Sequence, residues 1–294
     1  MSYDIKNQRF GIEIEVAGIT KDKARRAVRD GLGVPRRNVL QSGVKDRDGR
    51  LWKVVGDSSI DRVNGREGAE VVSPILTYDD LEKVQDVVRA LKQAGGVPHR
   101  SCGIHVHIDA GPHDAGSLGR LAKIVWKNEE LILDALGVSS GRRGSYAKPL
   151  EDDFIDKVVR RKPRTLDDLN RMWYGRFIPN PSHYDSTRYH GLNLHNVWYR
   201  KTVEFRYFNA SLHAGKVKGY IQFCLALSAK ALNSRSASHR RKQRIRGGDK
   251  FDFRVFLLGL GLIGDEFKTA RQHLLARLSG NASWRRYEGR RNEG

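Results

Sequence analysis

Polar residues interrupt three apolar stretches of the chain at every second position. These stretches are 10–16 (FGIEIEV), 103–109 (GIHVHID) and 202–208 (TVEFRYF). Alternation with a period of two is typical of a β-strand with one buried and one polar face. If the three strands share one sheet, a single surface gathers six polar side chains into a reaction centre or a metal site. The three pairs are Glu13/Glu15, His105/His107 and Glu204/Arg206.

Each pair taken alone also has a purely structural interpretation. Two glutamates on one strand face are typical of an antiparallel sheet with one solvated side. Two histidines on one face are a frequent metal arrangement, but a hydrogen-bonded structural pair explains them equally well. A Glu-x-Arg pair on its own would be a salt bridge worth about 0.2–1 kcal/mol. The coincidence of three such pairs favours a site.

Helical patterns are distributed unevenly between the strands. Apolar positions three or four residues apart, capping residues and glycine stops predict helices at 20–32, 77–94, 118–136, 165–174, 215–232, 252–262 and 265–278. Further strands are expected at 51–56, 69–73 and 189–194, with loops at 57–68 and 139–148. Strands that do not alternate evenly with helices favour an α+β fold, in which helices pack on one face of a curved antiparallel β-sheet. We expect a single domain over 1–280, with a basic loop at 234–248, and a basic tail at 281–294.

Composition narrows the choice of partner and compartment. The 294 residues include 54 Lys and Arg against 34 Asp and Glu, and the resulting net charge of +20 favours anionic partners. The chain shows neither a signal-peptide pattern nor an apolar run of membrane-spanning length. Its only cysteines, Cys102 and Cys224, exclude a disulfide framework. We therefore expect a cytoplasmic protein without a membrane partner.

Two further acidic residues extend the polar set. Glu70 lies in the apolar segment 68–74 (GAEVVSP), where an unpartnered carboxylate would be costly. Asp57 follows the expected strand 51–56, and a turn-capping role explains it as well as a ligand role does. Oxygen-rich groups with a few imidazoles suit magnesium or manganese ions that keep positions open for phosphate oxygens.

The segments 10–15, 68–74, 102–109 and 202–206 resemble, in this order, the successive motifs of the amidoligase family. That family belongs to the carboxylate–amine ligase superfamily, together with glutamine synthetase and glutamate–cysteine ligase. The resemblance runs from about residue 10 to 232, and four motifs in the right order are more specific than any one alone. It implies a fold like the glutamine synthetase catalytic domain, with a sheet curved around magnesium ions.

The resemblance also implies an ATP-dependent ligase. ATP would phosphorylate a carboxylate substrate to an acyl phosphate, and an amine substrate would displace the phosphate to give an amide. Magnesium or manganese would bridge the ATP phosphates and the substrate carboxylate. The implied metal ligands are Glu13, Glu15, Asp57, Glu70, Glu204 and at least one of His105 and His107.

Basic residues would complete the implied site. Arg206 would stabilise charge on the transferred phosphoryl group. Glu13 and Arg188 are the other two residues expected to be catalytic. Arg188 and Asn193, which precede the Glu-x-Arg strand, would grip a substrate carboxylate or an ATP phosphate. A basic loop would cover ATP through Arg142, Arg143, Tyr146 and Lys148, although solvated loop charge explains these residues equally well. The sequence has no Gly-x-x-x-x-Gly-Lys-Ser/Thr motif, which excludes a P-loop.

The high positive charge keeps other classes open. The segment 240–246 (RRKQRIR) is either a docking site for an anionic polymer, such as nucleic acid or an acidic peptide, or a solvated loop. A metal-dependent nuclease or phosphodiesterase would use the same carboxylates and imidazoles, and a non-catalytic nucleic-acid-binding protein would use the charge alone. A cupin-like oxygenase fits the two histidines, but no glutamate follows them at the expected short distance. The ordered motifs favour the ligase.

Overall fold

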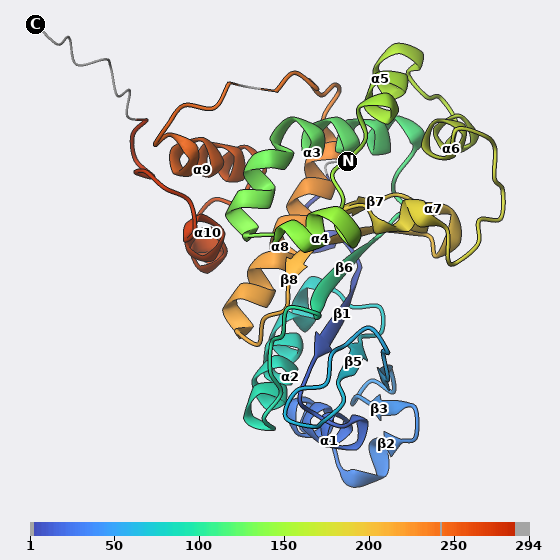
Figure 1. Cartoon of the computed structure of the whole chain (residues 1–294), viewed down its shortest axis with the longest axis vertical. Coiled ribbons are helices and arrows are strands. Elements are labelled where there is room, and N and C mark those ends of the chain that lie inside the picture. The colour runs from blue at the N-terminus through green and yellow to red at the C-terminus, as the bar shows by residue number, and fades with distance from the viewer. Residues whose placement is uncertain (1–2, 242, 286–294) are drawn as a thin grey trace, which may run out of the picture.

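An open antiparallel sheet forms the centre of the protein. The computed structural model describes residues 3–241 and 243–285 (Figure 1). Within them, eight strands pair in the order β2-β3-β4-β5-β1-β6-β8-β7. The strands are β1 (Phe10–Val16), β2 (Val39–Leu40), β3 (Gly43–Lys45), β4 (Leu51–Val55), β5 (Ala69–Val72), β6 (Gly103–Asp109), β7 (Leu192–Asn193) and β8 (Thr202–Asn209).

The register of the sheet aligns the polar positions of neighbouring strands. Glu13 of β1 lies opposite His105 of β6, and Glu15 lies opposite Glu70 of β5. His107 lies in turn opposite Glu204 of β8. Directly opposed residues point to the same face of a sheet, so the polar pairs of the three central strands share one face.

Long helices cover the opposite, apolar face of the sheet, and short helices lie beside its polar face. The α-helices are α1 (Lys21–Leu32), α2 (Leu81–Gln93), α3 (Ala115–Leu136), α4 (Ser140–Ser145), α5 (Asp152–Arg161), α6 (Leu166–Tyr174), α7 (His195–Tyr199), α8 (Ala214–Asn233), α9 (Asp249–Gly259) and α10 (Lys268–Leu275). Short 3₁₀-helices are η1 (Ile5–Asn7), η2 (Arg36–Asn38), η3 (Tyr78–Asp80), η4 (Ser186–Tyr189) and η5 (Asp265–Phe267). Helix α8 packs against α2, α3, α10 and β6, while α1 packs against α2 and β4. This arrangement confirms the predicted α+β fold.

The apolar residues of the alternating strands form the centre of the core. Ile12, Ile14, Ile104, Val106 and Phe205 are almost completely buried. At about 25 cal/mol per Å² of apolar surface, complete burial of each such side chain stabilises the fold by about 1.5–3 kcal/mol relative to exposure. The same alternation therefore fixes the fold and delivers the polar side chains to the other face.

Several sequence predictions need correction. The expected loop 139–148 contains helix α4, whose N-cap Ser139 accepts a hydrogen bond from the Arg142 backbone, and α5 was missing from the prediction. The strand expected at 189–194 is reduced to Leu192–Asn193, because Tyr189 belongs to η4 and His190 forms only an isolated bridge with Lys148. Strands β2 and β3 were also missed, since two or three residues are too few to show a period.

The C-terminal helices are displaced from the expected ranges. Helix α9 covers Asp249–Gly259 rather than 252–262, and the expected helix 265–278 begins as η5 and ends at Leu275. The described part of 234–248 contains neither helix nor strand. Most of the predicted tail, residues 286–294, lies outside the described residues. No helix in the described ranges is long and apolar enough to cross a membrane.

Candidate active site

A cavity of about 630 Å³ lies over the polar face of the sheet. Its floor carries side chains of β1, β4, β5, β6 and β8, and residues of α4, η4 and α7 contribute to its walls. Binding sites for small molecules and cofactors typically have volumes of about 300–1,000 Å³. The cavity is therefore large enough for a nucleotide or a substrate of similar size.

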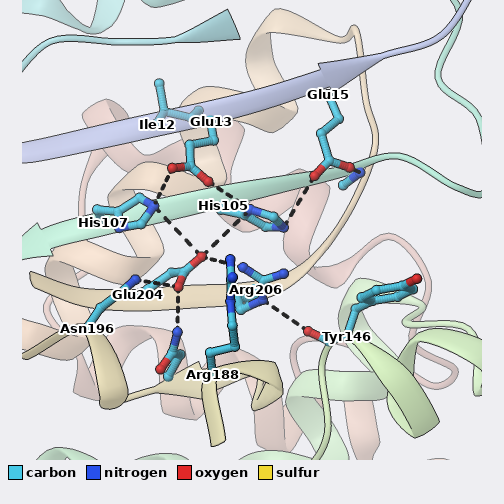
Figure 2. A network of polar contacts seen from close by, with 12 residues as sticks. Ile12, Glu13, Glu15, His105, His107, Tyr146, Arg188, Asn196, Glu204 and Arg206 are labelled. Carbon is cyan, nitrogen blue, oxygen red and sulfur yellow. Dashed lines mark hydrogen bonds and ion pairs between the residues drawn. The ribbon is translucent and has the colours of Figure 1, made fainter. Parts of the chain in front are cut away.

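Two histidines and two glutamates meet at the centre of the floor (Figure 2). Glu13 Oε2 lies 3.0 Å from His105 Nδ1, and Glu13 Oε1 lies 3.4 Å from His107 Nε2. Glu204 Oε1 lies 3.7 Å from His105 Nδ1 and 3.8 Å from His107 Nε2. The other ring nitrogen of His107 contacts Thr202 Oγ1 at 3.2 Å, while its buried Nε2 makes no hydrogen bond. An unsatisfied nitrogen between two carboxylates is a suitable ligand atom for a cation.

The cluster offers two groups of ligand atoms that could each hold a metal ion. One group is Glu13, Glu70 and His105, and the other is Glu13, His107 and Glu204. In each group the ligand atoms lie within 4.8 Å of one another. Carboxylates outnumber imidazoles, which suits magnesium or manganese. The residues present therefore fit the divalent ions that the sequence resemblance implies.

The remaining acidic residues lie at one side of this cluster. Glu15 Oε2 accepts a hydrogen bond of 2.6 Å from the backbone N–H of Gly103. Glu70 forms no ion pair with the described residues, and burial together with the charges of Glu13 and Glu15 raises its pKa to about 8. Asp57 lines the same cavity, and its Oδ1 caps the turn by accepting a hydrogen bond of 2.8 Å from the backbone N–H of Ser59. Crowded carboxylates of this kind favour binding of a cation, because a cation relieves their repulsion.

Glu204 is held from behind by amide and guanidinium donors. Its Oε2 accepts from the Nδ2 atoms of Asn193 and Asn196 at 2.6 and 2.7 Å, and its Oε1 accepts from Arg206 Nη1 at 2.6 Å. Burial would raise the pKa of Glu204, but Arg206 and the two histidines lower it to about 2. Asn193, which we expected to bind cofactor or substrate, is completely buried and orients Glu204 instead.

Three of the predicted basic residues line the cavity. Arg206 is 6% exposed, and its Nε donates to the Tyr146 carbonyl at 3.2 Å. Arg142 is buried and donates to the carbonyls of Cys102 and Arg206 at 3.4 and 3.2 Å. Arg188 donates to the His183 carbonyl at 3.1 Å. Backbone carbonyls therefore fix these guanidinium groups at the wall of the cavity.

The basic loop predicted to cover ATP divides into two parts. Arg142 and Tyr146 line the cavity. Arg143 instead donates to the Val138 carbonyl and to Asp134, both at 2.9 Å, and the exposed Lys148 makes backbone contacts to the strand region near β7. Successive residues of a helix point about 100° apart, so α4 cannot direct Arg142 and Arg143 to the same side. Neither Arg143 nor Lys148 lies where it was expected.

The sequence prediction missed two residues of the site, one in α7 and one at the C-cap of that helix. Asn196 lines the cavity and binds Glu204. Arg200 also lines it, and its Nη1 lies 3.1 Å from Glu13 Oε1. The spacing of Asn193 and Asn196, three residues apart and directly before the Glu-x-Arg strand, was the available signal for Asn196. Arg200 had the weaker signal of lying two residues before that strand.

The basic segment 240–246 is partly anchored to the protein. The Arg241 guanidinium carbon lies 3.8 Å from the centre of the Trp126 ring. Arg244 pairs with Asp134 at 2.8 Å and with Asp249 at 2.6 Å. Arg240 and Arg246 are exposed and form no ion pair with the described residues, whereas Lys242 lies outside them. Docking of an anionic polymer stays a prediction. Among the described residues of the segment, it would depend mainly on Arg240 and Arg246, because Arg241 and Arg244 already contact the protein.

Comparison with known proteins adds one positive finding. A family model described as putative amidoligase enzyme matches residues 6–228. The match begins before β1 and extends into α8, so it includes every residue of the metal-ligand groups and every cavity residue described above. A search of curated proteins finds no match to the chain.

Proposed function

Because the chain belongs to the amidoligase family, we propose that it joins a carboxylate to an amine at the expense of ATP and with magnesium or manganese. The γ-phosphoryl group of ATP passes to a carboxylate oxygen, giving ADP and an acyl phosphate. The amine nitrogen then forms a bond to the acyl carbon while the carbon–oxygen bond to phosphate breaks. The products are an amide and inorganic phosphate.

The observation that carries this proposal is the pair of ligand groups that share Glu13. One side of Glu13 faces His105 and Glu70, and the other faces His107 and Glu204. When bound, divalent ions supply the positive charge that holds phosphate oxygens and a substrate carboxylate together. The five residues would hold these ions, and the cavity beside them has room for the nucleotide.

The chain's own cations act on the substrate groups. Arg206 is oriented by Glu204 and Tyr146, so its remaining N–H groups are fixed relative to the floor of the cavity. Arg188 and Arg142, which backbone carbonyls hold at the cavity, would bind phosphate or substrate carboxylate oxygens. These groups do not have to reorganise when charge develops on the transferred phosphoryl group.

We also propose a cytoplasmic location. It is supported by Cys102 and Cys224, which are both buried and unpaired. Buried thiols without a disulfide suit a reducing compartment.

Calorimetry of ATP binding tests the proposed function. Magnesium or manganese should be required, and Glu70→Gln and Glu204→Gln should each lower the affinity at least about 10-fold, because loss of a metal ligand costs more than loss of its hydrogen-bonding partner. The exposed Glu82 on α2 provides the control variant Glu82→Gln, which should bind as the wild type does. Equal ATP affinity in a chelator would contradict the metal assignment, and DNA cleavage without ATP would support a nuclease.

A further inference from the structure

A second cavity of about 320 Å³ adjoins the first on the other side of Glu13. Glu13, Val72 and Arg200 line both cavities. The ion pair between Arg200 Nη1 and Glu13 Oε1, 3.1 Å long, therefore lies at their common boundary. His107 lines the second cavity, and Figure 2 shows it on the opposite side of Glu13 from Glu15. The two compartments thus meet at the proposed reaction centre.

The floor of the second cavity is open because of Gly11. This residue stands two positions before Glu13 in β1, so a side chain there would point to the same face. A Cβ atom at Gly11 would meet no other atom closer than 3.8 Å, and its φ is not in the left-handed region. Neither crowding nor backbone conformation requires glycine here. Glycine within a strand commonly marks the close approach of a ligand or another backbone.

A bulge in the strand pairing lies beside Gly11 and lines the same cavity. Phe10 exchanges two backbone hydrogen bonds with Leu76, whereas Ile12 is bonded to Ser73 through its N–H and its carbonyl. The residues at positions 74 and 75 therefore oppose Gly11 alone. Two residues opposite one define a β-bulge, a feature that is common next to active sites. Here the bulge forms the wall of the second cavity.

The lining of the second cavity has one apolar side and also contains charged residues of both signs. Val72, Pro74 and the 68% exposed Ile75 provide the apolar side. Lys201 lines the cavity and forms no ion pair with the described residues. Glu13, which pairs with Arg200, provides a carboxylate where this cavity meets the first one. A ligand that matches these groups carries a carboxylate, an amino group and an apolar side chain.

We propose that this second cavity is the amine subsite and that the amine is an α-amino acid with an apolar side chain, an inference that rests on the proposed ligase function. Its carboxylate binds Lys201, its side chain packs against Val72 and Ile75, and its nitrogen points past Glu13 to the acyl phosphate. The nitrogen forms the amide bond as the bond from carbon to the phosphate oxygen breaks. Of the two protons that the ammonium group loses, the departing phosphate accepts one and water the other.

Leucine binding tests the subsite directly. The probes are L-leucine and L-leucinamide, which lacks the carboxylate, titrated into the full chain with magnesium and a non-hydrolysable ATP analogue. Leucine should bind the wild type more tightly than leucinamide, and Lys201→Gln should reduce this preference. Gly11→Val should lower leucine affinity at least about 10-fold by filling the floor, and valine is well suited to a strand. The affinity for the nucleotide should remain unchanged.

A matched variant separates filling of the cavity from general damage. Gly259 also has an ordinary φ and open space at its Cβ position, but lies on α9 outside both cavities. Gly259→Val should bind leucine as the wild type does. Unchanged leucine affinity in Gly11→Val, or nucleotide binding by the wild type without leucine binding, would overturn the subsite alone. If the wild type binds neither the nucleotide nor leucine, the proposed function itself is overturned.

Discussion

Replacing Arg206 by lysine separates a role in the reaction from a role in folding. Arg206 uses Nη1 for Glu204 at 2.6 Å and Nε for the Tyr146 carbonyl at 3.2 Å. A lysine nitrogen keeps the charge beside Glu204 but cannot occupy both positions. Loss of one hydrogen bond should lower the free energy of unfolding by about 1 kcal/mol. For a chain of this size, the melting temperature should then fall by only about 2–4 °C.

Turnover should fall much further than stability in this variant. A lysine cannot reproduce the planar fork of a guanidinium at a phosphoryl oxygen, so the release of ADP should slow by about 100-fold or more. The assay supplies ATP, magnesium and pools of carboxylates and amines, and a parallel thermal melt measures stability. Arg143→Lys is the matched control, because Arg143 also binds one carbonyl and one carboxylate but lies outside the cavity. If turnover falls equally in both variants, or only in proportion to the unfolded fraction, Arg206 is a structural residue.

Two further predictions concern the helices behind the site and the basic segment. Burial raises the pKa of Glu129 from 4.5 to about 7, so the folded state keeps a proton that the unfolded state releases, and this group alone should lower the free energy of unfolding by about 3 kcal/mol between these pH values. Glu70, whose pKa is also raised, titrates in both proteins, so the test is the difference between them. Urea unfolding at several pH values should show the stability of the wild type falling by this amount relative to Glu129→Gln, and parallel curves for the two proteins would contradict the assignment. Replacing Arg240 and Arg246 with Gln should flatten the salt dependence of duplex DNA binding by about 0.9 per lost phosphate contact, with ATP binding intact. A wild type without salt-dependent affinity for DNA, RNA or acidic peptides would leave the segment as an anchored loop.

The strands that carry the site could be predicted from the sequence because a period of two has few competing explanations. The expected positions of β1, β6 and β8 agree with the structure to within about a residue. Their pairing could not be derived in the same way, because the register between distant strands depends on the whole sheet. The pairing of Glu13 with His105 and of Glu15 with Glu70 therefore emerges only in the structure.

Short helices account for most of the errors at the site. Helix α4 contains Gly141 and Gly144 in six residues, and glycine is a poor helix former, so the sequence pattern indicated a loop. Helix α7 has five residues, too few for an amphipathic pattern, yet it supplies Asn196 and ends beside Arg200. Tertiary contacts rather than helix propensity stabilise such short segments. Local sequence alone therefore could not show which basic residues would face the cavity.

The hydrogen bonds of Glu204 explain why a buried carboxylate can be held ready for a cation. An ionised carboxylate has about four lone-pair positions. Asn193, Asn196 and Arg206 donate to three of them, and the remaining position on Oε1 faces the two histidines. Arg206 and the two histidines keep Glu204 ionised. The three donors prevent its rotation, so the entropy of ordering this side chain is lost during folding rather than on binding of an ion. Removing an amide donor should then weaken metal-dependent ATP binding even though neither asparagine belongs to a candidate ligand group, which distinguishes an oriented metal ligand from a simple salt bridge to Arg206.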